Sequence, residues 1–338
     1  MIKDFPIIDL HCHLEGSIDP EISYEILHRI GYPPANTRKE FFRKVRDFTP
    51  DWTSFSEAVS LLDKCLIDRP NVMRVVSDII ERAVQKNVKI LELSFAPREF
   101  QLQKPRTGNV DPFFEAVLDG VEAGSSGKEI AVGLKLLILP RHLSDEFRKA
   151  YGDVGDIIKK YRSHLIGADI CTLDPIGEIG HSIGSVRRIC NFIKDIGLRL
   201  SAHAGEFNDA RSIARAITLG VDRIGHGIRI VGEKELIEIV KANNITLEIC
   251  PISNYRTGAI PAHEKHPLRK MLHLGMKVTI NSDDQSVQNS GWRDDYELAK
   301  WEIGLTETEL RQCLKYSYEA SFLDDKVKDK YGKYFTSP

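Results

Sequence analysis

Short hydrophobic runs of strand length recur along the chain, and each is followed by a turn residue and then by a segment with helical spacing. Eight such runs predict strands: 6–11, 89–95, 131–139, 165–171, 198–202, 223–224, 246–250 and 277–280. Between them, segments such as 72–86 place apolar residues at intervals of three and four, which is typical of amphipathic helices. Runs that are apolar on both faces indicate parallel strands covered by helices.

An open doubly wound sheet and a closed (β/α)8 barrel both fit this alternation of strands and helices. The positions of polar residues separate the two folds, because five of them stand at or just after the ends of separate predicted strands: His11, His203, His226, Ser253 and Asp283. In a barrel the carboxyl ends of all strands converge on one rim, whereas an open sheet would place these residues far apart. The sequence therefore predicts an α/β fold, a (β/α)8 TIM-type barrel.

We expect one domain over residues 1–338, with two additions to the barrel. The gap after the first strand, about 15–80, is too long for a single crossover and contains several helical stretches, so it predicts a helical cap inserted over the rim. Residues 294–331 predict extra C-terminal helices. No repeat or low-complexity tract indicates a second domain.

Charge and composition exclude several classes of protein. Lys+Arg 47 against Asp+Glu 49 gives a net charge of −2, so no strong field recruits a nucleic acid or an anionic membrane, and neither partner is expected. No secretory signal and no apolar run of about 20 residues is present. The six cysteines are scattered, unlike a disulfide framework. We expect a cytoplasmic protein.

Residues at the ends of four predicted strands carry metal-binding chemistry. His11 and His13 are two residues apart on a strand, so both imidazoles can project to one side. His203 and His226 follow two further strands, and of the adjacent carboxylates Asp283 and Asp284 one can bind a metal while the other faces the substrate. Three imidazoles and one carboxylate form a nitrogen and oxygen set that suits Zn²⁺, with Fe²⁺, Co²⁺ and Mn²⁺ as alternatives. A position left for water makes such a site catalytic, because the metal lowers the water's pKa from 15.7 to about 7. Glu206, three residues after His203, could then move protons.

Five short motifs occur in one order across almost the whole chain. They are His-Cys-His-Leu-Glu-Gly at 11–16, His-Ala-Gly-Glu at 203–206, Gly-His-Gly at 225–227, Cys-Pro-Ile-Ser-Asn at 250–254 and Asn-Ser-Asp-Asp at 281–284. Together they resemble the adenosine/adenine deaminase family of the amidohydrolase superfamily. The resemblance implies a (β/α)8 barrel that removes the 6-amino group of a purine by hydrolysis, with a small purine nucleoside or base as its partner.

Carried over position by position, the resemblance also implies roles for individual residues. One Zn²⁺ per chain would be held by four of them: His11, His13, His203 and Asp283. Glu206 would protonate the purine N1, His226 would orient the attacking hydroxide, and Asp284 would meet the leaving amine or N7. Substrate contacts are expected from His13, Glu15, Gly177 and Asp284.

Three positions bear on which purine is bound. At position 225 the chain has glycine, as adenosine deaminases do, whereas adenine deaminases tend to have aspartate there. Glu15 stands where adenosine deaminases usually have the aspartate that binds a ribose hydroxyl, and glutamate is common there in adenine deaminases. The family's glycine at the purine N3 corresponds to Gly177 after a short insertion, or to Thr172 in a gapless match. We expect zinc-dependent conversion of adenosine, 2′-deoxyadenosine or a 5′-modified adenosine to the 6-oxo product and ammonia, with adenine as the alternative substrate.

Other interpretations stay open. The apolar residues of segment 50–66, among them Trp52, Phe55 and Val59, could shield the purine or simply pack on the barrel. A binuclear barrel hydrolase is disfavoured because segment 165–173 has no lysine to bridge two metals. A catalytically silent relative is disfavoured because every implied ligand and proton-transfer residue is present.

Overall fold

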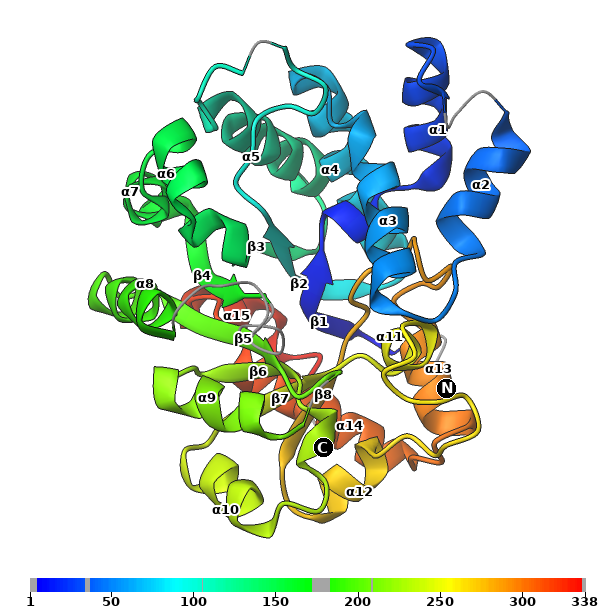
Figure 1. Cartoon of the computed structure of the whole chain (residues 1–338). Helices are drawn as coiled ribbons and strands as arrows, with labels where there is room; N and C mark the ends of the chain where they lie inside the picture. The colour runs from blue at the N-terminus through cyan, green and yellow to red at the C-terminus, as the bar shows by residue number, and fades with distance from the viewer. Residues whose placement is uncertain (1–4, 34–36, 105, 172–182, 208, 336–338) are drawn as a thin grey trace.

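The computed structural model describes residues 5–33, 37–104, 106–171, 183–207 and 209–335. Eight parallel strands form one sheet in sequence order (Figure 1). They are β1 (Ile7–His13), β2 (Val88–Phe95), β3 (Ala131–Ile138), β4 (Leu165–Ile170), β5 (Arg199–Ala204), β6 (Arg223–His226), β7 (Thr246–Ile249) and β8 (Lys277–Ile280). The predicted (β/α)8 barrel is confirmed.

The barrel closes between β1 and the residues that follow β8. The Asp283 amide donates to the His11 carbonyl at 2.8 Å, and the His13 amide donates to the Asp283 carbonyl at 3.1 Å. Three strands run two residues further than the hydrophobic runs predict, because the backbone of the polar residues at their ends still pairs with the next strand; Ala204, for example, pairs with His226. The closure therefore fixes three candidate ligands of the metal directly: His11, His13 and Asp283.

Helices surround the strands. The α-helices are α1 (Pro20–Arg29), α2 (Arg38–Arg46), α3 (Trp52–Leu62), α4 (Arg69–Gln85), α5 (Asp111–Ser125), α6 (Asp145–Tyr151), α7 (Val154–Lys160), α8 (Ile183–Asp195), α9 (Arg211–Leu219), α10 (Lys234–Ala242), α11 (Pro251–Arg256), α12 (Leu268–His273), α13 (Asp294–Trp301), α14 (Glu307–Ala320) and α15 (Asp325–Gly332). The 3-10 turns used below are η2 (Glu15–Ser17) and η4 (Asp63–Cys65).

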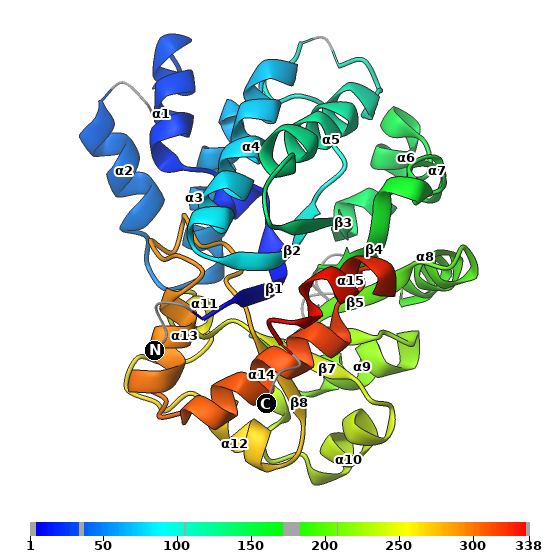
Figure 2. The same ribbon diagram turned by 180° about the vertical axis from the view of Figure 1, so that it is seen from behind.

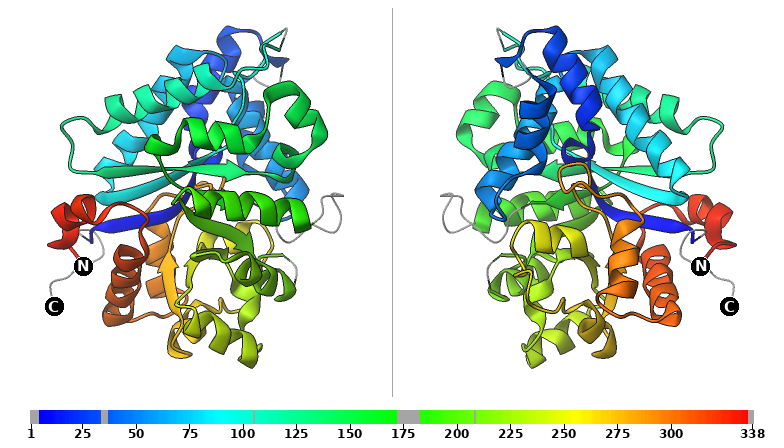
Figure 3. Two further views of the ribbon diagram at one scale, coloured as in Figure 1. Left: turned by 90° about the vertical axis from the view of Figure 1, so that its left-hand side faces the viewer. Right: turned by 90° about the vertical axis from the view of Figure 1, so that its right-hand side faces the viewer.

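The segment after β1 folds into short helices with strong N-terminal caps. Asp19 and Asp51 accept backbone N–H groups at the first turns of α1 and α3, and Asp68 does so for α4. The apolar stripe of α4 packs against α5 on the outside of the barrel, so α1 to α3 form the part that stands over the rim (Figure 3). The local sequence thus encodes both the insertion and the first outer barrel helix.

The C-terminal helices close the opposite end of the barrel. α14 packs against β8 and β1, and α15 follows it across the back of the molecule (Figure 2). Between them, the Ser321 hydroxyl and the Phe322 amide donate to Glu92 at 2.9 and 2.6 Å, and Arg223 donates to the Ala320 carbonyl at 2.9 Å. The segment that joins the two helices therefore contacts the interior of the barrel through Glu92 and Arg223. None of the helices described is long and apolar enough to cross a membrane.

Candidate active site

Four predicted metal ligands converge at the carboxyl end of the barrel. The Nε2 atoms of His11 and His203 lie 3.0 Å apart, and the Nε2 atom of His13 lies 3.2 Å from each of them. The Oδ1 atom of Asp283 lies 3.2 Å from Nε2 of His13 and 3.5 Å from Nε2 of His11. All four residues are buried, although they come from three different parts of the chain.

These spacings fit a metal centre. Bonds of 2.0–2.1 Å to a zinc ion place neighbouring ligand atoms about 3.3 Å apart, and the five distances given above, all except that from His203 to Asp283, are 3.0 to 3.5 Å. The four ligands are spread over three overlapping groups that could each hold a metal ion: His11, His203, His226 and Asp283; His11, His13, Asp169 and His203; and His13, Asp283 and Asp284. The types of donor atom and their spacing therefore both suit a bound metal ion.

Two buried carboxylates orient these imidazoles from behind. Oε2 of Glu248 lies 2.7 Å from Nδ1 of His11, and Oδ1 of Asp169 lies 3.1 Å from Nδ1 of His203. A carboxylate that accepts the Nδ1–H leaves the Nε2 lone pair facing the centre, as a metal ligand requires. Glu248 in turn forms a 2.5 Å ion pair with the buried Arg223. Burial would raise the pKa of Glu248, but Arg223 and other cations nearby lower it to about 2.

Sequence reasoning missed these supporting residues. Glu248, Asp169 and Arg223 lie within or at the ends of hydrophobic strand runs, where a charged residue is unusual. A charged residue in a hydrophobic strand run is therefore a signal by which they could have been predicted. The sequence does not show which histidine each carboxylate would meet, because the partners are 34 and 237 residues apart.

His226 and Asp283 share an uncommon backbone conformation. Their φ angles are 62° and 61°, in the left-handed region where a residue with a side chain costs of order 1–3 kcal/mol. This bend turns His226 toward Glu206, whose Oε2 atom lies 3.5 Å from the histidine Nε2 atom. Burial lowers the pKa of His226 well below its ordinary value, so its imidazole is neutral.

Asp284 lies within 4.8 Å of His13 and Asp283, measured between ligand atoms, and depends on Gly16. A Cβ atom on Gly16 would lie 1.8 Å from Oδ1 of Asp284, so only glycine leaves room for this carboxyl group. Burial, and then the adjacent Asp283 carboxylate, raise the pKa of Asp284 well above its ordinary value. A divalent cation bound to Asp283 would offset the second of these two effects.

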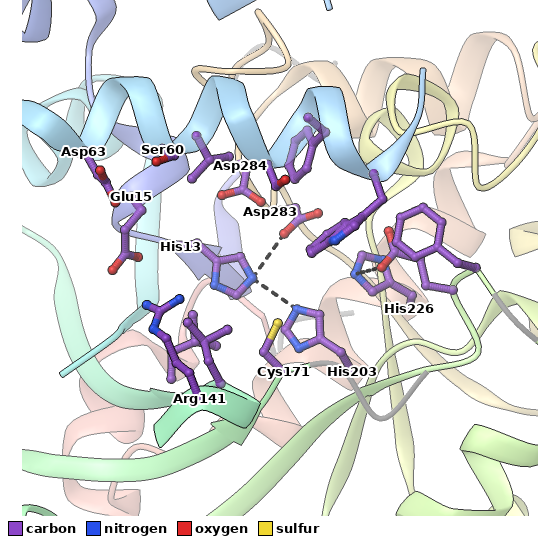
Figure 4. Close-up of a pocket in the computed structure, with 18 of the residues that line it drawn as sticks. His13, Glu15, Ser60, Asp63, Arg141, Cys171, His203, His226, Asp283 and Asp284 are labelled. Carbon is purple, nitrogen blue, oxygen red and sulfur yellow. Dashed lines mark hydrogen bonds and ion pairs between the residues drawn. The ribbon is translucent and has the colours of Figure 1, made fainter. Parts of the chain in front are cut away.

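A cavity of about 610 Å³ lies in front of this cluster and extends away from it (Figure 4). Its size is within the usual range for small-molecule sites. His13, His203, Glu206, Asp283 and Asp284 line the end near the candidate metal position. All the predicted catalytic and ligand residues except His11 therefore line one pocket with room for a small molecule.

The far end of the cavity is polar. Arg98 donates to Oε1 of Glu15 and to Oδ2 of Asp63, each at 2.6 Å, which ties the barrel rim to η4 of the cap. Glu15 also accepts the Ala96 amide at 3.1 Å, yet its Oε2 atom is buried and has no hydrogen-bond partner among the residues described. Figure 4 shows Glu15 and Arg141 facing this part of the cavity. One oxygen of Glu15 is thus satisfied by no described residue, although this atom has almost no exposed surface.

The cap supplies an apolar wall to the same cavity. Trp52, Phe55 and Val59 on α3 line it, and the rings of Trp52 and Phe207 meet edge to face with their centroids 5.5 Å apart. Phe55 is also part of the hydrophobic core. The same helix therefore packs into the core and faces the pocket, and shielding of a purine stays a prediction.

The structure describes Gly225 but neither of the two candidates for the purine N3 contact. Gly225 does not line the described cavity; a Cβ atom there would lie 2.7 Å from Cε1 of His11, so this glycine makes room for a candidate ligand. An aspartate at 225 would collide with His11 unless the ring moved. Gly177 and Thr172, the candidates for the N3 contact, lie outside the described residues.

Comparison with known proteins decides the family. The model of the family described as adenosine deaminase matches residues 6–333. The chain belongs to the adenosine deaminase family. It is therefore a hydrolase of the adenosine deaminase type, an aminohydrolase that acts on a cyclic amidine.

Individual relatives of this family member differ in their printed activities. The chain is 31% identical to an adenosine deaminase of Clostridium botulinum, over 97% of this chain and 96% of the relative. The structure resembles an adenine deaminase of Arthrobacter aurescens, with 26% identity, a TM-score of 0.85 and 98% of each chain covered. It also has the fold of an amidohydrolase of Burkholderia ambifaria crystallised with Zn, with 24% identity, a TM-score of 0.83 and 99% and 90% covered.

Proposed function

We propose that this member of the adenosine deaminase family converts adenosine to inosine and ammonia, with one zinc ion per chain. The observation that carries this proposal is the convergence of four donor atoms, each 3.0 to 3.5 Å from at least two of the others, at the end of a cavity that Glu206 and His226 also line. The same site would take 2′-deoxyadenosine or a 5′-modified adenosine if the far end of the cavity admits the changed sugar.

The zinc ion would be held by four residues: His11, His13, His203 and Asp283. Bound there, it would supply hydroxide at neutral pH. The nitrogen and oxygen donor set supports zinc, and the Burkholderia amidohydrolase of the same fold was crystallised with that metal.

Glu206 is the proposed acid. Its carboxyl group is buried, lines the cavity and lies 3.5 Å from the His226 imidazole, which places it beside the reacting end of the pocket. A proton given by Glu206 to the purine N1 would break the aromaticity of the ring and make C6 electrophilic. His226 would orient the nucleophile, and Asp284 would bind the leaving amine or N7 from the opposite wall.

The polar far end supports a nucleoside over a free base. Adenine alone would leave the unpartnered Oε2 atom of Glu15 without a hydrogen bond, whereas a ribose hydroxyl could donate to it. His13, Glu15 and Asp284 are the proposed substrate contacts among the described residues, and Gly177 is proposed for the N3 contact on the resemblance alone.

Adenine is the second candidate substrate, because two observations weaken the case for a nucleoside. Gly225, the residue typical of adenosine deaminases at this position, makes room for His11 and does not line the cavity. Arg98 already binds Oε1 of Glu15, so only one carboxylate oxygen remains for a sugar. The ratio of kcat/KM for adenosine to that for adenine separates the two, because it compares how well each transition state is bound.

Metal analysis tests the proposal against other classes of protein. β4 contains no lysine that could bridge two metals, so the proposal expects one zinc per chain after loading. Two metals per chain would point to a binuclear hydrolase. A zinc-loaded protein that leaves all 6-aminopurines unchanged would point to a catalytically silent relative.

A further inference from the structure

A chain of hydrogen bonds leads from His226 into the protein, away from the reacting centre. The Leu268 amide donates to Nδ1 of His266 at 3.1 Å, and Nε2 of His266 lies 3.2 Å from Oδ1 of Asn254. Nδ2 of Asn254 lies 3.1 Å from Nδ1 of His226. Asn254 belongs to α11, while His266 lies in the loop before α12. The three polar side chains are buried.

The first bond fixes the direction of all the others. A backbone N–H can only donate, so Nδ1 of His266 must accept. Burial lowers the pKa of His266 to about 3, so its ring is neutral and carries its single proton on Nε2. That proton is donated to Oδ1 of Asn254, which turns the amide NH₂ toward His226.

The last bond therefore sets the tautomer of His226. Nδ1 of His226 accepts from Asn254, so its proton is on Nε2, the atom 3.5 Å from Oε2 of Glu206 and directed at the pocket. The opposite amide orientation would place the Asn254 NH₂ group against the N–H of His266, with no acceptor between them. Only one tautomer satisfies every group in the chain.

We propose that His266 is a positioning residue for the deamination, acting through Asn254 to keep His226 as a hydrogen-bond donor toward the reacting centre. This inference rests on the proposed function. It makes His226 a group that holds and orients the nucleophile through its Nε2–H. It excludes His226 as the base that removes a proton from water, because Nε2 has no free lone pair in this tautomer.

Asn254→Asp is the decisive variant. Aspartate has nearly the same shape, accepts the proton of His266 and leaves a second acceptor facing Nδ1 of His226. The proton of His226 then moves to Nδ1, and the Nε2 donor is lost. We expect kcat to fall about 10²- to 10³-fold, as for loss of a donor to developing negative charge, with KM within about threefold.

Two variants of His266 form a matched pair. His266→Gln keeps an N–H donor for Oδ1 of Asn254, so we expect kcat within about fivefold of the wild type. His266→Leu removes the donor and frees the Asn254 amide to turn, so we expect kcat to fall at least about tenfold. Equal losses in both variants would contradict the proposal, because a role in packing alone does not depend on the retained donor.

Nitrogen-15 spectra of the zinc-loaded, histidine-labelled protein read the tautomer without any substrate. Signals of His226 are assigned by their loss in His226→Asn. We expect protonated Nε2 and unprotonated Nδ1 in the wild type and in His266→Gln, and protonated Nδ1 in Asn254→Asp. A wild-type spectrum with protonated Nδ1 overturns the proposal. Since the spectrum needs no turnover, failure of the proposed substrate assignment is seen separately, as the expected tautomer without activity. Equal zinc content and melting temperature show that each variant is folded.

Discussion

The Nδ1 atom of His11 lies 2.7 Å from the Oε2 atom of Glu248, and both side chains are completely buried. This contact connects the predicted metal position to the ion pair of Glu248 with Arg223 in the barrel interior. Because the barrel closes at His11 and Asp283, the same few residues hold the sheet together and aim the ligands. Metal affinity and the packing of the barrel interior are therefore coupled.

Glu248→Gln tests this coupling. The glutamine keeps the shape of the side chain but removes the charge that strengthens the hydrogen bond from His11 and balances Arg223. We expect zinc affinity to fall about 10- to 100-fold, as for other groups that orient a metal ligand from behind. Competition with a chromophoric chelator measures it. Glu238→Gln, on the exposed surface of α10, is the control. An unchanged affinity would show that Glu248 does not orient His11.

Glu206→Gln separates proton transfer from metal binding. The amide cannot give a proton to the purine N1, and Glu206 is not among the four proposed ligands. We expect full zinc content and a kcat lower by about 10²- to 10⁴-fold, measured by steady-state kinetics on the metal-loaded protein. Retained turnover would remove Glu206 from the role of acid.

Gly225→Ala tests the packing under His11. The added Cβ atom would lie 2.7 Å from Cε1 of His11, so the ring must shift. We expect a loss of about 1–3 kcal/mol in the free energy of unfolding of the metal-free protein, together with weaker zinc binding. Gly291→Ala is the control, because the nearest atom to a Cβ there is 3.9 Å away. If both variants unfold at the same urea concentration as the wild type, the cavity behind His11 is larger than the structure shows.

His266 predicts a pH dependence of stability. Its folded pKa is lowered from 6.5 to about 3, so the unfolded chain binds the extra proton first, and stability is present above pH 6.5 and lost as the pH falls toward 3. As the pH falls from 6.5 to 5, this residue should lower the free energy of unfolding of the wild type by about 2 kcal/mol, at about 1.4 kcal/mol per pH unit. The free energy of unfolding of His266→Gln, measured with urea at each pH, should not show this decrease. Parallel curves for the two proteins would show that His266 titrates normally.

The barrel, and most of the residues that meet at its carboxyl end, could be predicted from the sequence. Alternation of apolar strands with amphipathic helices is a local signal, and His11, His203 and Asp283 stand where parallel strands of a barrel must bring their ends together. The C-terminal helices could also be predicted, because apolar residues recur there at regular helical intervals.

The rest of the site depends on contacts that no local pattern records. The bond of Glu248 to His11 and the bridge from Arg98 to Glu15 and Asp63 join residues far apart in sequence. The left-handed backbone of His226 could not be anticipated either, since such a conformation is expected of glycine. Gly225 was interpreted through substrate choice, whereas its space is occupied by a histidine ring.

The central claim is that the metal-loaded protein deaminates a purine nucleoside, and one measurement tests it most directly. Zinc-loaded protein is mixed in parallel with adenosine, adenine and a 5′-modified adenosine, and the loss of 6-aminopurine absorbance is followed. The account predicts loss with adenosine at a kcat/KM at least about 100-fold above that for adenine, because the ribose contacts of the polar end add to transition-state binding. Loss with adenine alone, or with none of the three, would contradict it.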